Sequence, residues 1–356
     1  MRAAGAGTMP AMVTVVRATQ LELNTAVQAL RDGELVAFPT ETVYGLGAHA
    51  GHPGALRRVF ELKGRPQSHP LIVHLDSPRF LTRWAREVPV AAERLAERFW
   101  PGPLTLVLPR TPQVHPLITG GQDTVAVRVP SHPMAQQLLT AFGGGIAAPS
   151  ANRFGRISPT RADHVREELG AAVHTILDGG ECKLGLESTI VACLGGQVRL
   201  LRPGAISLSQ LRRVVAEVRA DLPGGEAMPR VPGSTYAHYA PLTPLAIVPA
   251  DEIEELAEHL SEGGQRIAVL AQRPPLGTYQ SVTWINAGPR VDAYAHDFYA
   301  NLRTLDKAGC ARILVQAVPA DERWDAVRDR LRRAAAASAT PIPVDDDNSI
   351  AAGILP

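Results

Sequence analysis

Residues 38–75 read FPTETVYGLGAHAGHPGALRRVFELKGRPQSHPLIVHL, and they contain the densest structural signals in the chain. The short apolar run that leads into them meets a proline, which cannot donate to a central strand and therefore favours a strand end. Hydroxyl and carboxylate side chains follow at once, and Gly45 and Gly47 predict a tight turn. After a helical stretch, Lys63 and Arg65 place two cations on a second turn. This combination is typical of a site for an anionic ligand.

The composition sets limits on the class of protein. The chain has 356 residues, which is more than one typical domain, so two domains are expected. Its 36 Lys and Arg nearly balance 35 Asp and Glu, so binding to nucleic acid would need a local basic patch. Three scattered cysteines give neither a disulfide framework nor metal-site spacing, which predicts a reducing cytoplasm. No apolar run approaches the roughly 20 residues of a membrane span, so no membrane attachment is expected.

The order of apolar patterns predicts alternating strands and helices up to residue 219. Residues 1–12 lack an apolar signal-peptide core and are predicted to be a disordered leader, with Met1, Met9 or Met12 as the start. Thr160 is predicted to cap a helix that follows it. Helices are expected at 23–32, 53–62, 78–86, 90–99, 133–142 and 208–218, and strands at 35–38, 71–75, 104–108, 124–129, 146–149, 174–178, 188–193 and 198–202.

The strand at 124–129 is informative because its two faces differ. Alternation places three valines on one face and Thr124, Ala126 and Arg128 on the other. The valine face belongs to a core. Arg128 therefore either lines a cleft or lies on a solvated face.

The chain changes character after residue 220. A Pro- and Gly-rich stretch predicts a linker at 220–244, between a first domain at 13–219 and a small C-terminal α/β domain at 245–356. In the second domain, short apolar strands alternate with helices. The strands are expected at 245–248, 266–270, 281–285 and 311–315, and the helices at 251–261, 291–307 and 324–336.

Local patterns alone do not identify the chemistry. The sequence GLGAHA at 45–50 resembles a dinucleotide-binding turn, but the acidic residue expected about 20 positions later is missing. The chain has no P-loop and none of the G-x-S-x-G, H-E-x-x-H or C-x-x-C motifs. Lys63 and Arg65 either bind phosphate or complement a helix end. His74 fits a hydrogen-bonded core position as well as a ligand-binding one, and the polar turn after residue 149 fits an Asx turn as well as a ligand cradle.

Several motifs in a fixed order together resemble the threonylcarbamoyl-AMP synthase family in its longer, two-domain form. The resemblance runs from about residue 14 to 241. The motifs are PTETVYGLG (39–47), K-x-R-P-x-x-x-P-L-I-V-H (63–74), WPGPLTLVL (100–108), VAVRVP (125–130), APSAN (148–152), STI (188–190), LRPG (201–204) and HYAP (238–241).

The resemblance implies a fold and a reaction. The expected fold is an α/β architecture with a twisted, mixed sheet, surrounding helices and a cationic concave face, plus a smaller C-terminal α/β, Rossmann-like domain. The implied reaction joins L-threonine, bicarbonate and ATP into L-threonylcarbamoyladenylate and releases pyrophosphate. A separate transferase complex would then modify the adenosine next to the anticodon of certain tRNAs. Mg²⁺ would be held mainly by the phosphates, and no metal ligand from the protein is expected.

The resemblance also implies roles for individual residues. The L-threonine pocket would consist of Thr42, His74, Arg128 and Ser188. The ATP site would consist of Lys63, Arg65, His69, Thr124, Ser150, Asn152, Ser158, Arg202 and His238. Within this set, Lys63 and Arg65 would stabilise charge during the reaction. His69 stands where relatives often have Asn, and His238 would bring the linker over the nucleotide as a lid.

Two other functions fit parts of the pattern. An RNA-binding module could use the cationic concave face directly, but near-zero net charge and the lack of aromatic residues among the cations weigh against it. A carbamoyl-phosphate-handling domain would carry zinc-binding parts, for which this chain has no C-x-x-C. A weak contact with tRNA is compatible with the sequence.

Overall fold

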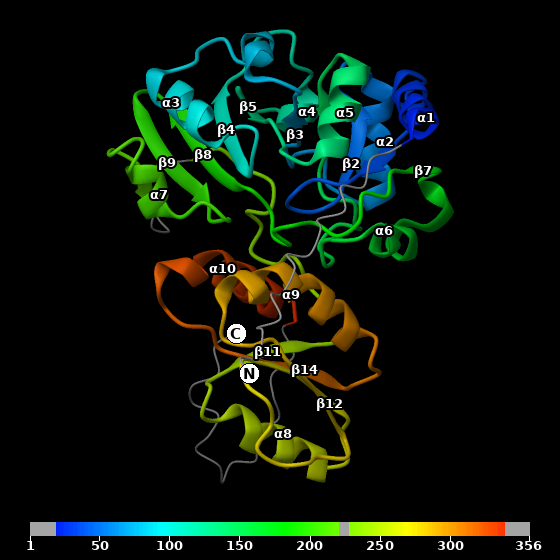
Figure 1. Ribbon diagram of the computed structural model, residues 1–356, viewed down its shortest axis with the longest axis vertical. Helices are drawn as coiled ribbons and strands as arrows, with labels where there is room; N and C mark the ends of the chain where they lie inside the picture. Colours follow the sequence, from blue (N-terminus) through cyan, green and yellow to red (C-terminus); the bar gives the residue numbers. More distant parts are fainter. Residues whose placement is uncertain (1–18, 221–227, 339–356) are drawn as a thin grey trace, which may run out of the picture.

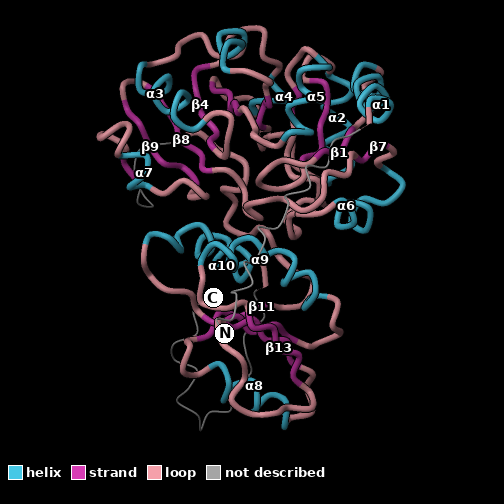
Figure 2. The backbone as a smooth tube through the Cα atoms, viewed as in Figure 1, coloured by secondary structure: helices cyan, strands magenta, loops and turns pink. Residues whose placement is uncertain are grey.

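The computed structural model describes residues 19–220 and 228–338, and these residues form two stacked α/β bodies (Figure 1). The predicted leader and residues 221–227 of the predicted linker lie outside the described residues. A ten-stranded sheet belongs to the first body and a four-stranded sheet to the second. The tube in Figure 2 shows two helices of the second body lying between its own sheet and the first body.

The large sheet is mixed and runs in the order β10-β9-β8-β4-β5-β3-β6-β2-β1-β7. Parallel pairs such as β3 with β5 and β4 with β8 alternate with antiparallel pairs such as β4 with β5. This arrangement confirms the predicted fold class. The strands are β1 (Val36–Phe38), β2 (Gly45–His49), β3 (Ile72–His74), β4 (Leu104–Pro109), β5 (Thr124–Arg128), β6 (Ile146–Ala147), β7 (Thr175–Ile176), β8 (Thr189–Leu194), β9 (Gln197–Arg202) and β10 (Arg219–Ala220).

Local sequence signals account for the helix ends of the first body. Thr19 and Glu22 form a capping box at the start of α1, and Gly64 ends α2 in the left-handed conformation with φ 62°. The helices are α1 (Gln20–Arg31), α2 (Pro53–Lys63), α3 (Val90–Phe99), α4 (Pro116–Thr119), α5 (Pro133–Phe142), α6 (Ala162–Leu169) and α7 (Leu208–Arg212), with 3-10 turns at Pro78–Arg83 and Gly170–Ala172.

The tight turn predicted at Gly45 and Gly47 is wrong, because both glycines lie in strand β2. Crowding explains why position 47 favours a glycine. A Cβ there would lie 2.8 Å from Cγ2 of Ile146 and 2.9 Å from Cε1 of Phe38. Gly47 lets neighbouring strands pack closely because it has no side chain, and it does not form a turn.

Two other local expectations also differ from the structure. Thr160 does not cap α6, because Arg161 is the N-cap residue and its side chain makes no capping hydrogen bond. The amide of Thr160 instead donates to Nδ1 of His164 at 3.2 Å. The helix expected at 208–218 is short, and the chain continues to β10, which pairs with the sheet edge. In both places tertiary contacts override a local preference.

Strand β5 has the two faces that its alternation predicts. Val125 and Val127 belong to the main core of the first body. Ala126 packs on the opposite face with Ile72 and Val231. The second face is therefore covered by a segment beyond residue 228, not by solvent.

The second body contains a parallel sheet in the order β11-β14-β12-β13. Its strands and helices alternate along the chain, as the sequence predicts for a small α/β domain. The elements are β11 (Leu245–Val248), α8 (Ile253–Glu262), β12 (Ile267–Ala271), β13 (Val282–Asn286), α9 (Val291–Asp306), β14 (Arg312–Gln316), a 3-10 turn at Glu322–Trp324, and α10 (Asp325–Ala336).

A shared apolar core joins the two bodies. Val43 and Leu186 of the first body belong to the same cluster of buried residues as Phe298 and Leu302 of α9. Burial of apolar surface at such a contact favours a fixed arrangement of the two bodies. Within 19–220 and 228–338, no helix combines the length and apolar character needed to cross a membrane.

Replacing Gly47 by Ala should destabilise the first body. The added methyl overpacks the contact among β1, β2 and β6, with an expected loss of about 1–3 kcal/mol in the free energy of unfolding. Urea unfolding measures this loss. Gly263→Ala is the control, because a Cβ there would have its nearest contact at 3.4 Å. Equal stability of both variants would contradict the crowding explanation.

Candidate functional site

One cavity brings together residues from several strand ends of the first body and from the segment after residue 228. Eight of the predicted site residues line it, including the whole predicted threonine set. These are Thr42, His74, Arg128 and Ser188 from that set, and Arg65, Ser150, Arg202 and His238 from the nucleotide set.

Sheet register positions the Arg128 side of the cavity. The parallel pairing of β3 and β5 places His74 beside Arg128. The Arg128 guanidinium donates to Oγ1 of Thr42 at 2.9 Å and forms an ion pair with Glu41 at 2.8 Å. Burial, with Arg128 nearby, lowers the pKa of His74 to about 3, so this imidazole is neutral at pH 7. The Arg128 guanidinium, paired with Glu41 and bonded to Thr42, therefore lies beside an uncharged ring.

Ser188 and Arg202 also line the cavity. Oγ of Ser188 lies 2.8 Å from Oγ1 of Thr105, which fixes the serine against β4. Arg202 donates to the carbonyl oxygen of Ser188 at 2.9 Å, to its Oγ at 3.1 Å, and to the carbonyl oxygen of Pro232 at 2.7 Å. These acceptors are neutral, so they hold the guanidinium in place without cancelling its charge.

Arg65 is the second such cation. It donates to the carbonyl oxygen of Pro70 at 2.8 Å, and its buried Nε has no hydrogen-bond partner among the described residues. Burial lowers the pKa of Arg65 to about 10, so the side chain remains charged at neutral pH. A buried guanidinium held by neutral oxygens is suited to an anionic ligand.

Lys63 lies beneath the cavity and does not line it. Its ammonium donates to the carbonyl oxygen of Ser150 at 2.6 Å and also to that of Asn152. Burial lowers its pKa well below the usual value. Lys63 thus holds the 150–152 loop in position from below.

The other predicted nucleotide residues also lie outside the cavity lining. Ser158 is fully buried and donates to Oε1 of Glu187. Asn152 donates to two backbone carbonyls, and its Oδ1 has no hydrogen-bond partner among the described residues. Thr124 is half-buried at the far end of β5, opposite Pro109.

An aromatic residue that the sequence reasoning missed links the remaining histidines. The Phe154 ring lies 5.2 Å from the ring of His69 and 5.8 Å from that of His238, edge to face in both cases. The Arg65 guanidinium lies 5.7 Å from the same ring. Phe154 follows the APSAN motif by two residues, and this proximity was the one available signal.

The cavity wall also contains Tyr239 and Glu187, which are not among the predicted site residues. Tyr239 is buried, has φ 64°, and its hydroxyl has no hydrogen-bond partner among the described residues. A residue other than glycine held at positive φ is uncommon, and such strain is concentrated at functional sites. Glu187 also lines the cavity. Both residues adjoin positions that the motifs had already marked, namely His238 and Ser188.

The segment from 228 to 244 forms part of the cavity wall. Pro232, Gly233, His238 and Tyr239 contribute to the lining. Arg230 anchors the segment, because its amide donates to Oε1 of Gln122 at 2.7 Å. This contact fixes the segment against the first body, next to the residues that line the cavity.

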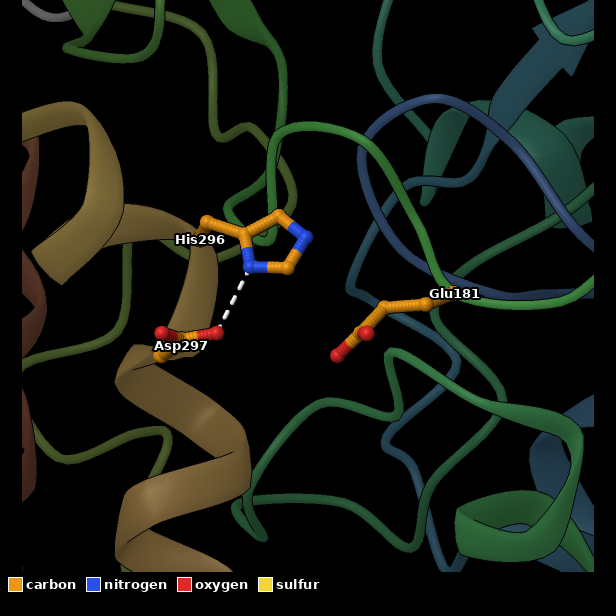
Figure 3. Close-up of side chains that lie close together, drawn as sticks. All are labelled: Glu181, His296 and Asp297. Carbon is orange, nitrogen blue, oxygen red and sulfur yellow. Dashed lines mark hydrogen bonds and ion pairs between the residues drawn. The ribbon is translucent and has the colours of Figure 1, made fainter. Parts of the chain in front are cut away.

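A cluster of three possible metal ligands lies elsewhere, and none of its members lines the cavity (Figure 3). Nδ1 of His296 lies 2.7 Å from Oδ1 of Asp297, and the Glu181 carboxylate pairs with Arg161 at 2.8 Å. Each of the three residues therefore already interacts with another side chain of the protein.

Comparison with known proteins now identifies the family. The family model described as "Telomere recombination" matches residues 28–204, and the one described as "Threonylcarbamoyl-AMP synthase, C-terminal domain" matches residues 206–336. The threonylcarbamoyl-AMP synthase of Pyrococcus abyssi is 42% identical over 327 residues, covering 89% of this chain and 95% of that protein. The chain belongs to the threonylcarbamoyl-AMP synthase family. The threonylcarbamoyl-AMP synthase of Bacillus subtilis is 40% identical over 317 residues, covering 87% of this chain and 92% of that protein.

Solved structures agree with membership of the threonylcarbamoyl-AMP synthase family. The crystal structure of P. abyssi Sua5 complexed with L-threonine matches with a TM-score of 0.84 and 40% identity, covering 91% of this chain and 96% of that one. A variant of that protein with a consecutive His and Tyr replaced by Ala matches with a TM-score of 0.84 and 39% identity. These matches span both bodies and confirm the predicted family and its enzyme class, a nucleotidyltransferase.

The low pKa of His74 predicts a pH dependence of stability. The unfolded chain takes up a proton at His74 near pH 6.5, whereas the folded chain does so only near pH 3. The free energy of unfolding should therefore fall as the pH drops from 6.5 towards 3, by up to about 1.4 kcal/mol per pH unit. Urea unfolding at several pH values should give a smaller slope for His74→Gln. His259→Gln, at an exposed position of α8, is the control, and an unchanged slope in His74→Gln would contradict the assignment.

Proposed function

We propose that this enzyme makes L-threonylcarbamoyladenylate from L-threonine, bicarbonate and ATP, with release of pyrophosphate. The product would supply a separate cytoplasmic transferase complex that modifies tRNA next to the anticodon. The observation that carries the proposal is the placement of Arg65, Arg128 and Arg202 on one cavity. Two of these cations are hydrogen-bonded to neutral oxygens, which favours a polyanionic ligand such as a triphosphate.

L-Threonine would occupy the Arg128 side of the cavity. The guanidinium fork suits a carboxylate, and neutral His74 adds no second charge there. Thr42 and Ser188 offer hydroxyls for the substrate's own hydroxyl or amine. The threonine complex named for the P. abyssi structure supports this assignment.

ATP would occupy the Arg65 and Arg202 side. Ser150 and His238 line the same cavity, and Lys63 would act by holding the loop that carries Ser150. The other predicted nucleotide residues, His69, Thr124, Asn152 and Ser158, do not line the cavity, and Thr124 lies at the far end of β5.

No enzyme nucleophile is needed for the proposed reaction. The amine of threonine adds to carbon dioxide derived from bicarbonate, losing a proton, and gives a carbamate. A carbamate oxygen then attacks the α-phosphorus, and pyrophosphate leaves. Catalysis consists of positioning two substrates and stabilising charge with fixed cations.

Mg²⁺ would neutralise the phosphates and would be held mainly by them. The donor set around the cavity fits this arrangement. Glu187 is the carboxylate among the lining residues, and its oxygens already accept hydrogen bonds from Ser158, Tyr299 and Arg330. The protein's own task is then to bind the phosphates through guanidinium groups.

The segment at 228–244 would act as a lid over the nucleotide. Its His238 and Tyr239 form the one consecutive His-Tyr pair in the chain, the same residue pair as is replaced in the P. abyssi variant. A lid would exclude water from a mixed anhydride that hydrolyses readily.

Replacing Arg65 by Ala should lower threonine- and bicarbonate-dependent release of pyrophosphate from ATP on the order of a hundredfold, as does loss of a fixed charge-stabilising donor. Arg58→Ala is the matched control, because Arg58 is exposed on neighbouring α2 and pairs with Glu34. Full activity of the Arg65 variant would refute its role. No pyrophosphate release by the wild-type enzyme would refute the proposed reaction.

Gly233→Ala tests the lid separately. Gly233 has φ 76°, and a Cβ there would lie 2.1 Å from the hydroxyl of Tyr239. The lid should then close poorly, so less intact threonylcarbamoyladenylate should be recovered per pyrophosphate released. Chromatography of the nucleotide products measures this ratio, and Tyr236→Ser, at a 76% exposed position of the same segment, is the control. An unchanged ratio in Gly233→Ala would argue against the lid.

A further inference from the structure

Glu187 is an acid in a cavity that otherwise presents cations. It is 6% exposed and immediately precedes Ser188. An uncompensated carboxylate at this position would repel a triphosphate and would compete with it for the nearest guanidinium. The structure must therefore neutralise Glu187 if the cavity is to bind ATP.

The C-terminal domain supplies the neutralising group. Nε of Arg330, on α10, donates to Oε2 of Glu187 at 3.0 Å, and the Arg330 side chain is fully buried. The hydroxyl of Tyr299, on α9, donates to the same oxygen at 2.9 Å. Asp329 and the carbonyl oxygen of Pro203 bind the other edge of the Arg330 guanidinium and hold it towards Glu187.

Arg202 is the cation that Glu187 would otherwise attract. Both residues contact Ser188, Glu187 as its chain neighbour and Arg202 through three hydrogen bonds. The two charges are close enough for each to influence the pKa of the other. Arg202 nevertheless binds neutral oxygens only, among the hydrogen bonds of the described residues.

We propose that Arg330 is the counter-ion of Glu187, supplied by the C-terminal domain, and that it keeps Arg202 available for the phosphates of the nucleotide. This proposal rests on the proposed ATP site. It makes Arg330 a positioning residue, since it acts on the substrate through Glu187 and Arg202. It also gives the C-terminal domain a defined part in the reaction.

Ion pairs at α9 dock the C-terminal domain against the first body close to Glu187. Two of them come from the helix itself and a third from Lys307 just after its end. The buried one links Arg303 to Glu168 at 3.2 Å, and Arg303 also donates to the carbonyl oxygen of Ile157. Ile157 adjoins Ser158, which is itself bonded to Glu187. The contact of Arg303 with Ile157 is therefore connected, through the neighbouring Ser158, to the Glu187 carboxylate.

The experiment compares Arg330→Met, Glu187→Gln/Arg330→Met and wild type. Calorimetric titration gives the dissociation constant for ATP, and pyrophosphate release gives kcat and the KM values. In Arg330→Met the free carboxylate should engage Arg202, so ATP binding should weaken on the order of tenfold or more, as expected for a lost charge-assisted contact. In the double variant the carboxylate of the cavity lining is gone, and ATP binding should return to within about threefold of wild type.

Arg332→Met is the matched control, because Arg332 lies on the same helix at an exposed position. It should leave ATP binding and turnover unchanged. A merely structural role for Arg330 would be shown by a double variant as impaired as Arg330→Met, and this result would overturn the proposal. Wild-type affinity in Arg330→Met would overturn it as well.

Two further outcomes remain decisive. If Arg330→Met does not fold because a buried charge is left unpaired, the double variant still tests the proposal through its ATP affinity. If wild type binds ATP but releases no pyrophosphate with threonine and bicarbonate, the proposed reaction fails. The affinities of the variants for ATP then decide the role of Arg330 independently.

Discussion

Positive charge buried without a matching acid is the constraint on which the site depends. Arg65 and Arg202 are almost fully buried, and backbone carbonyl oxygens hold them in place. Taking a guanidinium out of water is costly unless an ion or a strong set of acceptors replaces the lost hydration. The carbonyls restore part of the hydrogen bonding and leave the charge uncompensated. The buried positive charge therefore favours the binding of an anionic ligand.

The mixed sheet makes this arrangement rigid. Parallel pairing of β3 with β5 and of β4 with β8 brings His74, Arg128 and Thr105 to one end of the sheet, next to the residues that precede β8. Close packing at Gly47 and the buried cores on both sides of the sheet fix the strand positions. Side chains on such a framework lose little entropy when a ligand binds, because their positions are set in advance.

The second domain completes the electrostatics of the first. Glu187 stands among the cations, and its hydrogen bonds lead out of the cavity to α9 and α10. The segment that joins the domains also contributes His238 and Tyr239 to the cavity lining. One contact surface therefore serves two purposes: it docks the domains through a shared apolar core and it determines which charges face the ligand.

The sequence by itself determined most elements, the fold class and the family, because periodicity, helix caps and ordered motifs are local properties of the chain. It also singled out Arg128, because the alternation of side chains in β5 placed this residue either in a cleft or on a solvated face. Only the tertiary structure decided between these, since a segment beyond residue 228 covers that face. The same holds for Gly47, which signalled a turn but lies in a strand, because the crowding comes from β1 and β6. The tertiary structure alone also shows that Lys63 bonds to the loop at Ser150 and that Arg330 pairs with Glu187. The residues in each of these pairs are 87 or more positions apart in the chain, so no local sequence pattern encodes the contact.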